Sequence, residues 1–130
     1  MTWQAAPGST LLVPSGSKKH LHVIVLGPIA LRNYGNAPQI ALVSVTTRYP
    51  GIPIDSTCIL VPGEHEFVKH ESWVSYRSLR IDTEAHAQAR IAEHVWSVHA
   101  SCSALLLQRI RAGVCASMFT TGEFRQLFGC

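Results

Sequence analysis

The chain has 130 residues, which is the size of one domain. Hydrophobic residues make up 47% of it and charged residues only 15%, so we expect a homodimer that covers part of the apolar surface. The formal net charge of +3 allows an anionic ligand but excludes a histone-like excess of positive charge.

The expected location is the cytoplasm, without membrane association. No apolar run approaches the roughly 20 residues that cross a bilayer, and the N-terminus lacks the basic and apolar regions of a secretion signal. The cysteines are scattered without a Cys-x-x-Cys pair, so we expect all of them as reduced thiols: Cys58, Cys102, Cys115 and Cys130.

The composition suggests a single domain with three parts, which are residues 1–17, 18–82 and 83–130. Pro7, Gly8, Pro14 and Gly16 predict a loosely ordered arm over residues 1–17, in which residues 11–13 offer a short strand. The middle part is rich in strands, and the last part is expected to be a helical tail.

Two strands dominate the middle part. In residues 20–26, Leu21, Val23 and Val25 alternate with His20, His22 and Ile24 and therefore face the opposite way. Residues 39–47 are almost continuously apolar and end in polar residues, which predicts a central strand buried on both faces. Shorter strands are expected over residues 57–61 and 72–81.

The last part contains three helix signals. Asp82, Thr83 or Glu84 can cap a helix within residues 85–95, and Ser101 or Ser103 can cap a second helix that ends near Gly113. A short helix is expected over residues 121–128. Strands followed by helices predict a mainly β, α+β fold, namely a small, SH3-like, partly open β-barrel with C-terminal helices.

Residues 63–76 carry more polar groups than a core requires. His65, Lys69, His70 and Ser72 lie among Phe67, Trp73 and other apolar residues. Imidazoles, hydroxyls and a cation are the groups that move protons and stabilise a charged phosphorane in RNA cleavage. This segment is therefore expected to line a site.

The runs 20–25, 40–47, 58–60 and 62–72 resemble the PemK/MazF-like toxins of type II toxin-antitoxin systems. The similarity is greatest to the branch with the signature Gly-Asp-His-Pro-Phe-Ile-x-His-x-Ser and covers roughly residues 18–82. It implies a compact dimeric barrel that cleaves single-stranded RNA without a metal and is neutralised by a cognate antitoxin.

The resemblance also assigns roles to residues. The family's catalytic arginine, at the start of a strand, falls on His20, and its catalytic threonine or serine falls on Thr46, with Thr47 adjacent. Histidine can act as an acid or base but holds phosphate less securely than arginine does. Glu66 replaces the proline of the signature and brings a carboxylate near the expected phosphate site, which weakens RNA binding.

RNA cleavage by the 2′-hydroxyl needs a base, donors for the phosphate oxygens and an acid for the leaving oxygen. We expect His20 or His70 to serve as base and acid, Lys69 to hold the phosphate and Thr46 to donate a hydrogen bond. The expected substrate-binding residues are Thr47, Arg48, His65, Ser72 and Arg77.

Structural interpretations compete with these roles. Thr46 and Thr47 can simply close a strand, and His65 can fix a turn by bonding to its own backbone. Lys69 and His70 can belong to a solvated hairpin. The arginines Arg48, Arg77 and Arg80 can form ordinary surface pairs instead of following an RNA backbone.

Cofactor chemistry finds no support in the sequence. His20, His22, His65 and His70 match no established zinc spacing, and the chain has no Walker loop, dinucleotide fingerprint or Gly-x-Ser-x-Gly elbow. We therefore expect neither a metal nor a cofactor. The alternative function is a non-catalytic, toxin-like or regulatory binding protein on the same scaffold.

Overall fold

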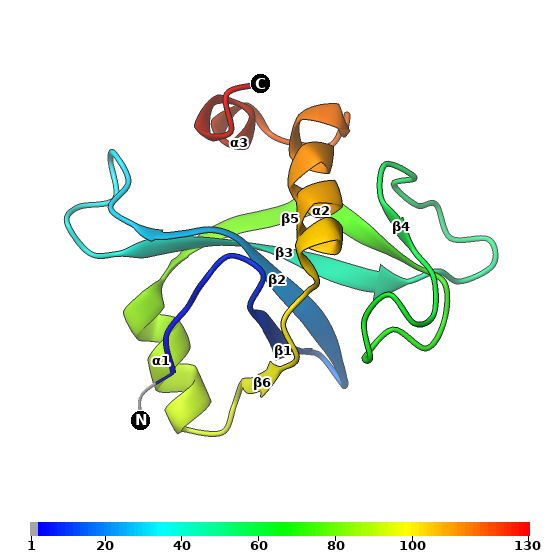
Figure 1. The fold of residues 1–130 in the computed structure, drawn as a ribbon, viewed down its shortest axis with the longest axis horizontal. Coiled ribbons are helices and arrows are strands. Elements are labelled where there is room, and N and C mark those ends of the chain that lie inside the picture. Colours follow the sequence, from blue (N-terminus) through cyan, green and yellow to red (C-terminus); the bar gives the residue numbers. More distant parts are fainter. Residues whose placement is uncertain (1–2) are drawn as a thin grey trace.

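The computed structural model of the chain describes residues 3–130 and contains one six-stranded sheet in the order β4-β5-β3-β2-β1-β6, in which all pairs are antiparallel. Figure 1 shows that the sheet curls, with α2 across one face and α1 at the opposite end of the molecule. The elements are β1 Thr10–Ser15, β2 Lys18–Ile29, β3 Gln39–Thr47, β4 Ile59–Leu60, β5 Ser72–Thr83, α1 Glu84–Ala92, β6 Ser97–His99, α2 Ala104–Ala116 and α3 Gly122–Leu127. The predicted mainly β fold, a small and partly open barrel with C-terminal helices, is confirmed.

The two central strands are buried on both faces, as their hydrophobic runs predicted. Leu21, Val23 and Val25 of β2 belong to a core under α2 and α3, whereas Ile24 belongs to a second core on the other face, beside α1. The first core also contains Val43, Val45, Val74, Tyr76, Ile110 and Phe124, and the second contains Leu11, Val13, Leu42, Ala87 and Trp96. The sheet is therefore the middle layer of the domain.

The strand register decides which polar residues share a face. Thr46 lies opposite Trp73 and Thr47 lies opposite Ser72 in the β3–β5 pair. Paired residues of antiparallel strands point to the same side of the sheet, and successive residues point to opposite sides. Thr46 and Trp73 are therefore on one face, and Thr47 and Ser72 are on the other.

Residues 10–15, within the expected arm, are more ordered than predicted. The strand expected at residues 11–13 is longer than predicted and covers Thr10–Ser15 (β1). Its first residue, Thr10, lies opposite Val23 of β2 on one side and opposite His99 of β6 on the other. Thr10 and Leu11 are fully buried. The expectation of a loosely ordered arm is wrong for β1, because its backbone pairs on both sides and its apolar side chains enter the second core.

The helices begin where the capping residues predicted, but one helix ends later. Thr83 caps α1 by accepting a hydrogen bond from the His86 amide, and Ser103 caps α2 in the same way. Gly113 lies inside α2 and does not end it. A side chain at this position would overlap the ring of Tyr76, so glycine is required here for close packing.

The cysteines also depart from the prediction. Cys115 and Cys130 form a disulfide with a Cα–Cα distance of 5.2 Å, whereas Cys58 and Cys102 are free. The chain turns back after α3, so residue 130 lies beside the C-terminal end of α2 (Figure 1). The expectation of four reduced thiols missed this pair, because nothing in the cysteine spacing shows which helices meet in space.

Candidate functional site

A pocket at one end of the barrel, here called the rim pocket, has a volume of about 280 Å³. It lies between the end of β3 and the loop that connects β4 to β5. Its lining residues are Val45, Thr47, Phe67, Val68, Lys69, His70 and Ser72. The fold thus gathers Thr47, Lys69, His70 and Ser72, all of which were predicted as site residues, around a single cavity.

The loop that carries Lys69 and His70 is held in place by local contacts. Val68 is buried in the first core, and its amide donates to the carbonyl of His65 over 2.9 Å. The Ser72 hydroxyl donates to the His70 carbonyl over 2.9 Å, so it supports the loop backbone. The side chains of Lys69 and His70 remain exposed and available to a ligand.

His65 has a structural position outside the rim pocket. It is only 5% exposed, its Nδ1 accepts a hydrogen bond of 3.0 Å from the Phe67 amide, and its Nε2 contacts the Ala100 carbonyl. These partners assign the tautomer with hydrogen on Nε2. Because Ala100 directly follows β6, His65 ties the β4–β5 loop to the opposite edge of the sheet. The interpretation of His65 as a turn-fixing residue agrees with this geometry.

His20 and Thr46 do not line the rim pocket. Thr46 shares a face with Trp73, opposite to the face of Thr47. Leu21 pairs with Val45 and His22 pairs with Ser44, so the next step along the same register brings His20 beside Thr46. The four residues predicted as catalytic are therefore divided between the two faces of the sheet, with Lys69 and His70 on the side of the rim pocket.

His22 shares the face of His20 and is 8% exposed. Burial lowers the pKa of His22 from 6.5 to about 4, with smaller contributions in the same direction from the charges of Arg80 and His20. The imidazole is therefore neutral at pH 7. Its Nδ1 lies 3.2 Å from the carbonyl oxygen of His20, which supplies a hydrogen-bond acceptor.

The predicted substrate-binding arginines have different surroundings. Arg48 forms an ion pair of 3.0 Å with Glu71, and both side chains are about half exposed, so the pair is weak. Arg77 lies over the ring of Phe119, with 4.6 Å from its guanidinium carbon to the ring centroid. Neither arginine lines the rim pocket.

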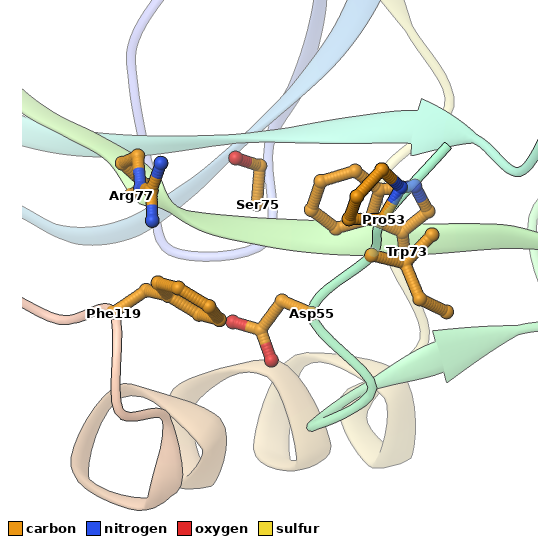
Figure 2. Close-up of a pocket in the computed structure, with 7 residues that line it drawn as sticks. Pro53, Asp55, Trp73, Ser75, Arg77 and Phe119 are labelled. Atoms are coloured by element: carbon orange, nitrogen blue, oxygen red, sulfur yellow. The ribbon is translucent and has the colours of Figure 1, made fainter. Parts of the chain in front are cut away.

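Arg77 lines a second cavity of about 140 Å³, here called the aromatic pocket (Figure 2). Its other lining residues are Pro53, Ile54, Asp55, Trp73, Ser75 and Phe119. Asp55 and Phe119 were not predicted as site residues. The Asp-Ser-Thr run at residues 55–57 signals a turn, but only the folded chain brings Ser117 to Asp55.

Asp55 is buried, and its carboxylate is well supplied with donors. Oδ1 accepts from the amide and the hydroxyl of Thr57 at 3.0 and 2.6 Å, and Oδ2 accepts from the Ser117 hydroxyl at 2.6 Å. Burial alone raises the pKa of Asp55, but the hydrogen bonds from Ser117 and Thr57 outweigh burial and lower the pKa. The carboxylate is therefore ionised at neutral pH.

Within residues 3–130 no group of three or more His, Cys, Asp or Glu residues converges well enough to hold a metal ion. None of the described helices has the length and apolarity to cross a membrane. The chain forms a small, partly open β-barrel, and Thr47, Lys69, His70 and Ser72 supply the polar groups of its rim pocket. No family model matches the chain, and no curated protein matches it.

Proposed function

We propose that the chain is a toxin-type endoribonuclease that cleaves single-stranded RNA without a metal, with the rim pocket as its active site. The observation that carries the proposal is the gathering of Thr47, Lys69 and His70 around one cavity at the open end of the barrel. The resemblance of residues 18–82 to the PemK/MazF-like toxins supplies the reaction class.

The roles in the reaction follow from the chemistry of these side chains. His70 accepts the proton of the RNA 2′-hydroxyl as its oxygen attacks the phosphorus, and the Lys69 ammonium stabilises the phosphorane charge. Thr47, in place of Thr46, donates a hydrogen bond to a phosphate oxygen. The bond from phosphorus to the 5′-oxygen breaks, this oxygen takes a proton from water, and the protonated His70 returns its proton to the hydroxide that remains. The products are a 2′,3′-cyclic phosphate and a 5′-hydroxyl.

A homodimer and a cognate antitoxin belong to the same proposal. Phe67, which lines the rim pocket, is 36% exposed, and two further apolar side chains are exposed in the loops on either side of β4, Ile52 at 60% and Val61 at 50%. Apolar surface of this kind favours a protein partner that covers the rim. Such a partner would block access of RNA to Lys69 and His70.

A non-catalytic binding protein is the second candidate, and one observation favours it. His70 is the single imidazole among the residues that line the rim pocket, and His20 faces the other side of the sheet. A pocket with one cation and one imidazole can hold a phosphate or a carboxylate without cleaving it.

Incubation of purified protein with a mixed-sequence, single-stranded RNA in the presence of EDTA tests the proposal. We expect cleavage that resists EDTA and falls by about 10²–10⁴ in His70→Ala. His86→Ala is the matched control, because this exposed histidine of α1 lies at the opposite end of the 12-residue strand β5 from the β4–β5 loop. We also expect His20→Ala to retain activity.

The possible outcomes separate the candidates. Loss of cleavage in His20→Ala together with full activity in His70→Ala would assign the reaction to the other face and refute the rim pocket as the active site. If the wild type leaves RNA intact but arrests growth when expressed, the binding protein is correct. If the protein neither cleaves RNA nor arrests growth, both toxin functions are refuted and an antitoxin or immunity protein is indicated.

A further inference from the structure

The aromatic pocket combines apolar walls with polar groups of opposite charge. Figure 2 shows Ser75 and Arg77 on the β5 side of the pocket, and Asp55 and Phe119 on the facing side. Trp73 and Pro53 close one end of it. The volume of about 140 Å³ is close to that of a cavity which accommodates one benzene ring, about 150 Å³, so the pocket encloses one ring of a planar ligand and leaves a second ring at its open mouth. The pocket therefore suits a small planar ligand better than an extended chain.

The Asp55 carboxylate has one acceptor position left for such a ligand. A carboxylate offers about four lone-pair sites, and Thr57 and Ser117 occupy three of them. The remaining site is on Oδ2. Within residues 3–130 no cation forms an ion pair with this buried carboxylate. A ligand that donates a hydrogen bond would supply the missing partner.

Arg77 is oriented for a ligand that accepts hydrogen bonds. Its guanidinium carbon lies 4.6 Å from the centroid of the Phe119 ring, and no carboxylate in the described part of the chain pairs with it. Stacking on an aromatic ring leaves the N–H groups at the edge of the guanidinium free to form a bidentate contact. The half-buried Ser75 hydroxyl lies two residues earlier on the same side of β5 and adds a further donor or acceptor.

We propose that the aromatic pocket binds a guanine base. Guanine presents two adjacent acceptors, O6 and N7, to which arginine binds in bidentate fashion, and two donors, N1–H and N2–H, on the neighbouring edge. Arg77 takes the acceptor edge, Asp55 Oδ2 accepts from the donor edge, and Trp73 covers the ring. Each good bidentate contact discriminates against a wrong base by about 5- to 150-fold.

The charges exclude simpler ligands. A lone cation would be repelled by Arg77, and a lone anion would be repelled by Asp55. Adenine has one acceptor next to a donor on the edge that arginine reads, so it cannot form the bidentate contact. The guanine site lies outside the rim pocket and does not depend on the ribonuclease proposal.

NMR titration of the full chain tests the guanine site directly. The indole N–H signal of Trp73, assigned with Trp73→Phe, is followed while GMP, AMP, CMP or UMP is added. We expect a saturable shift with GMP and an affinity at least about fivefold higher than for the other nucleotides. A short single-stranded RNA with one guanine is titrated in the same way. Tighter binding of this RNA than of GMP indicates that the ligand is a guanine within RNA, whereas binding no tighter than that of GMP indicates a free nucleotide.

The variants separate recognition from folding. Asp55→Asn removes the charge but also disturbs the contacts with Thr57 and Ser117, so Arg77→Lys serves as the second variant. Arg77→Lys keeps the charge and loses the bidentate contact, and it should remove the preference for GMP. Arg32→Lys, at an exposed arginine in another loop, is the matched control and should bind GMP like the wild type.

Three results would overturn the guanine site. These are equal affinity for the four nucleotides, an unchanged Trp73 signal at millimolar GMP, and an unaltered GMP preference in Arg77→Lys. Because GMP binding is measured without cleavage, loss of RNA cleavage in His70→Ala has no bearing on it, and failure of either proposal can be recognised separately.

Discussion

Tyr76 of β5 donates a buried hydrogen bond of 2.8 Å to the carbonyl oxygen of Ile110 in α2, at the point where Gly113 leaves room for the phenol ring. This contact joins the longest helix to the sheet. Burial, together with the neighbouring Cys58 thiol, raises the pKa of Tyr76, so the phenol stays protonated and remains a donor at all physiological pH values.

Gly113→Ala should destabilise the fold. In an unhindered helix this change stabilises by up to about 1 kcal/mol, but here the new methyl group would meet the Tyr76 ring, and overpacking costs about 1–3 kcal/mol. Urea unfolding followed by circular dichroism measures the change. Gly122→Ala is the control, because its added Cβ meets no atom within 4 Å. Equal unfolding midpoints for the two variants would contradict the packing role of Gly113.

Reduction of the Cys115–Cys130 disulfide should lower the melting temperature. A closed loop of about 15 residues stabilises by about 3 kcal/mol in the chain-entropy model, and the bridge spans a sequence separation of 15. The melting temperature is measured with and without dithiothreitol. The double variant C115S/C130S should melt like the reduced wild type and should not respond to the reductant, and a response in this variant would assign the effect to other groups.

His22 should make the fold sensitive to acid. Its folded-state pKa of about 4 is below the unfolded value of 6.5, so between these values the unfolded chain binds more protons and stability falls as the pH falls. The loss amounts to up to about 3 kcal/mol and is complete below about pH 4. Unfolding free energies of the wild type and His22→Gln, measured from pH 7 to pH 4, should differ in this window. Parallel pH profiles would rule out burial of a neutral His22.

His65→Ala should loosen the edge of the sheet at β6. The substitution removes the partner of the Phe67 amide and one of the two donors to the Ala100 carbonyl, the other being the Thr10 hydroxyl at 2.6 Å. Unsatisfied buried groups cost about 1–3 kcal/mol. Amide hydrogen exchange should accelerate at residues 97–100 and remain unchanged in β3. Uniform acceleration along the chain would point to global destabilisation instead.

The pattern of hydrophobic residues was sufficient to predict the central strands β2 and β3. β2 and β3 are buried on both faces, and burial of this kind produces long apolar runs that few other structures share. The strands β1 and β6 are different. β1 contains a proline, and β6 has only three residues and depends on backbone pairing with the distant β1. Such pairing leaves no periodic signal in the sequence.

The candidate site was predictable only where its parts are close in sequence. Lys69 and His70 lie three and two residues before Ser72, the first residue of β5, and Ser72 pairs with Thr47 at the end of β3, so their meeting with Thr47 follows from the β3–β5 pairing. The alternation of side chains already separates Thr46 from Thr47, but the sequence does not show over which face the β4–β5 loop folds. The Asp55–Ser117 contact spans 62 positions and is visible only in the folded chain.

The burial of β3 determines where this barrel can acquire new specificity. Positions 39–45 are all buried, and only Thr46 and Thr47 at the end of the strand are partly exposed. A substitution at positions 39–45 must fit the packing of the two cores, whereas a substitution at position 46 or 47 need not. A combinatorial library that varies positions 47, 69 and 70 would therefore sample new ligands on an unchanged framework, and most of its members should still fold.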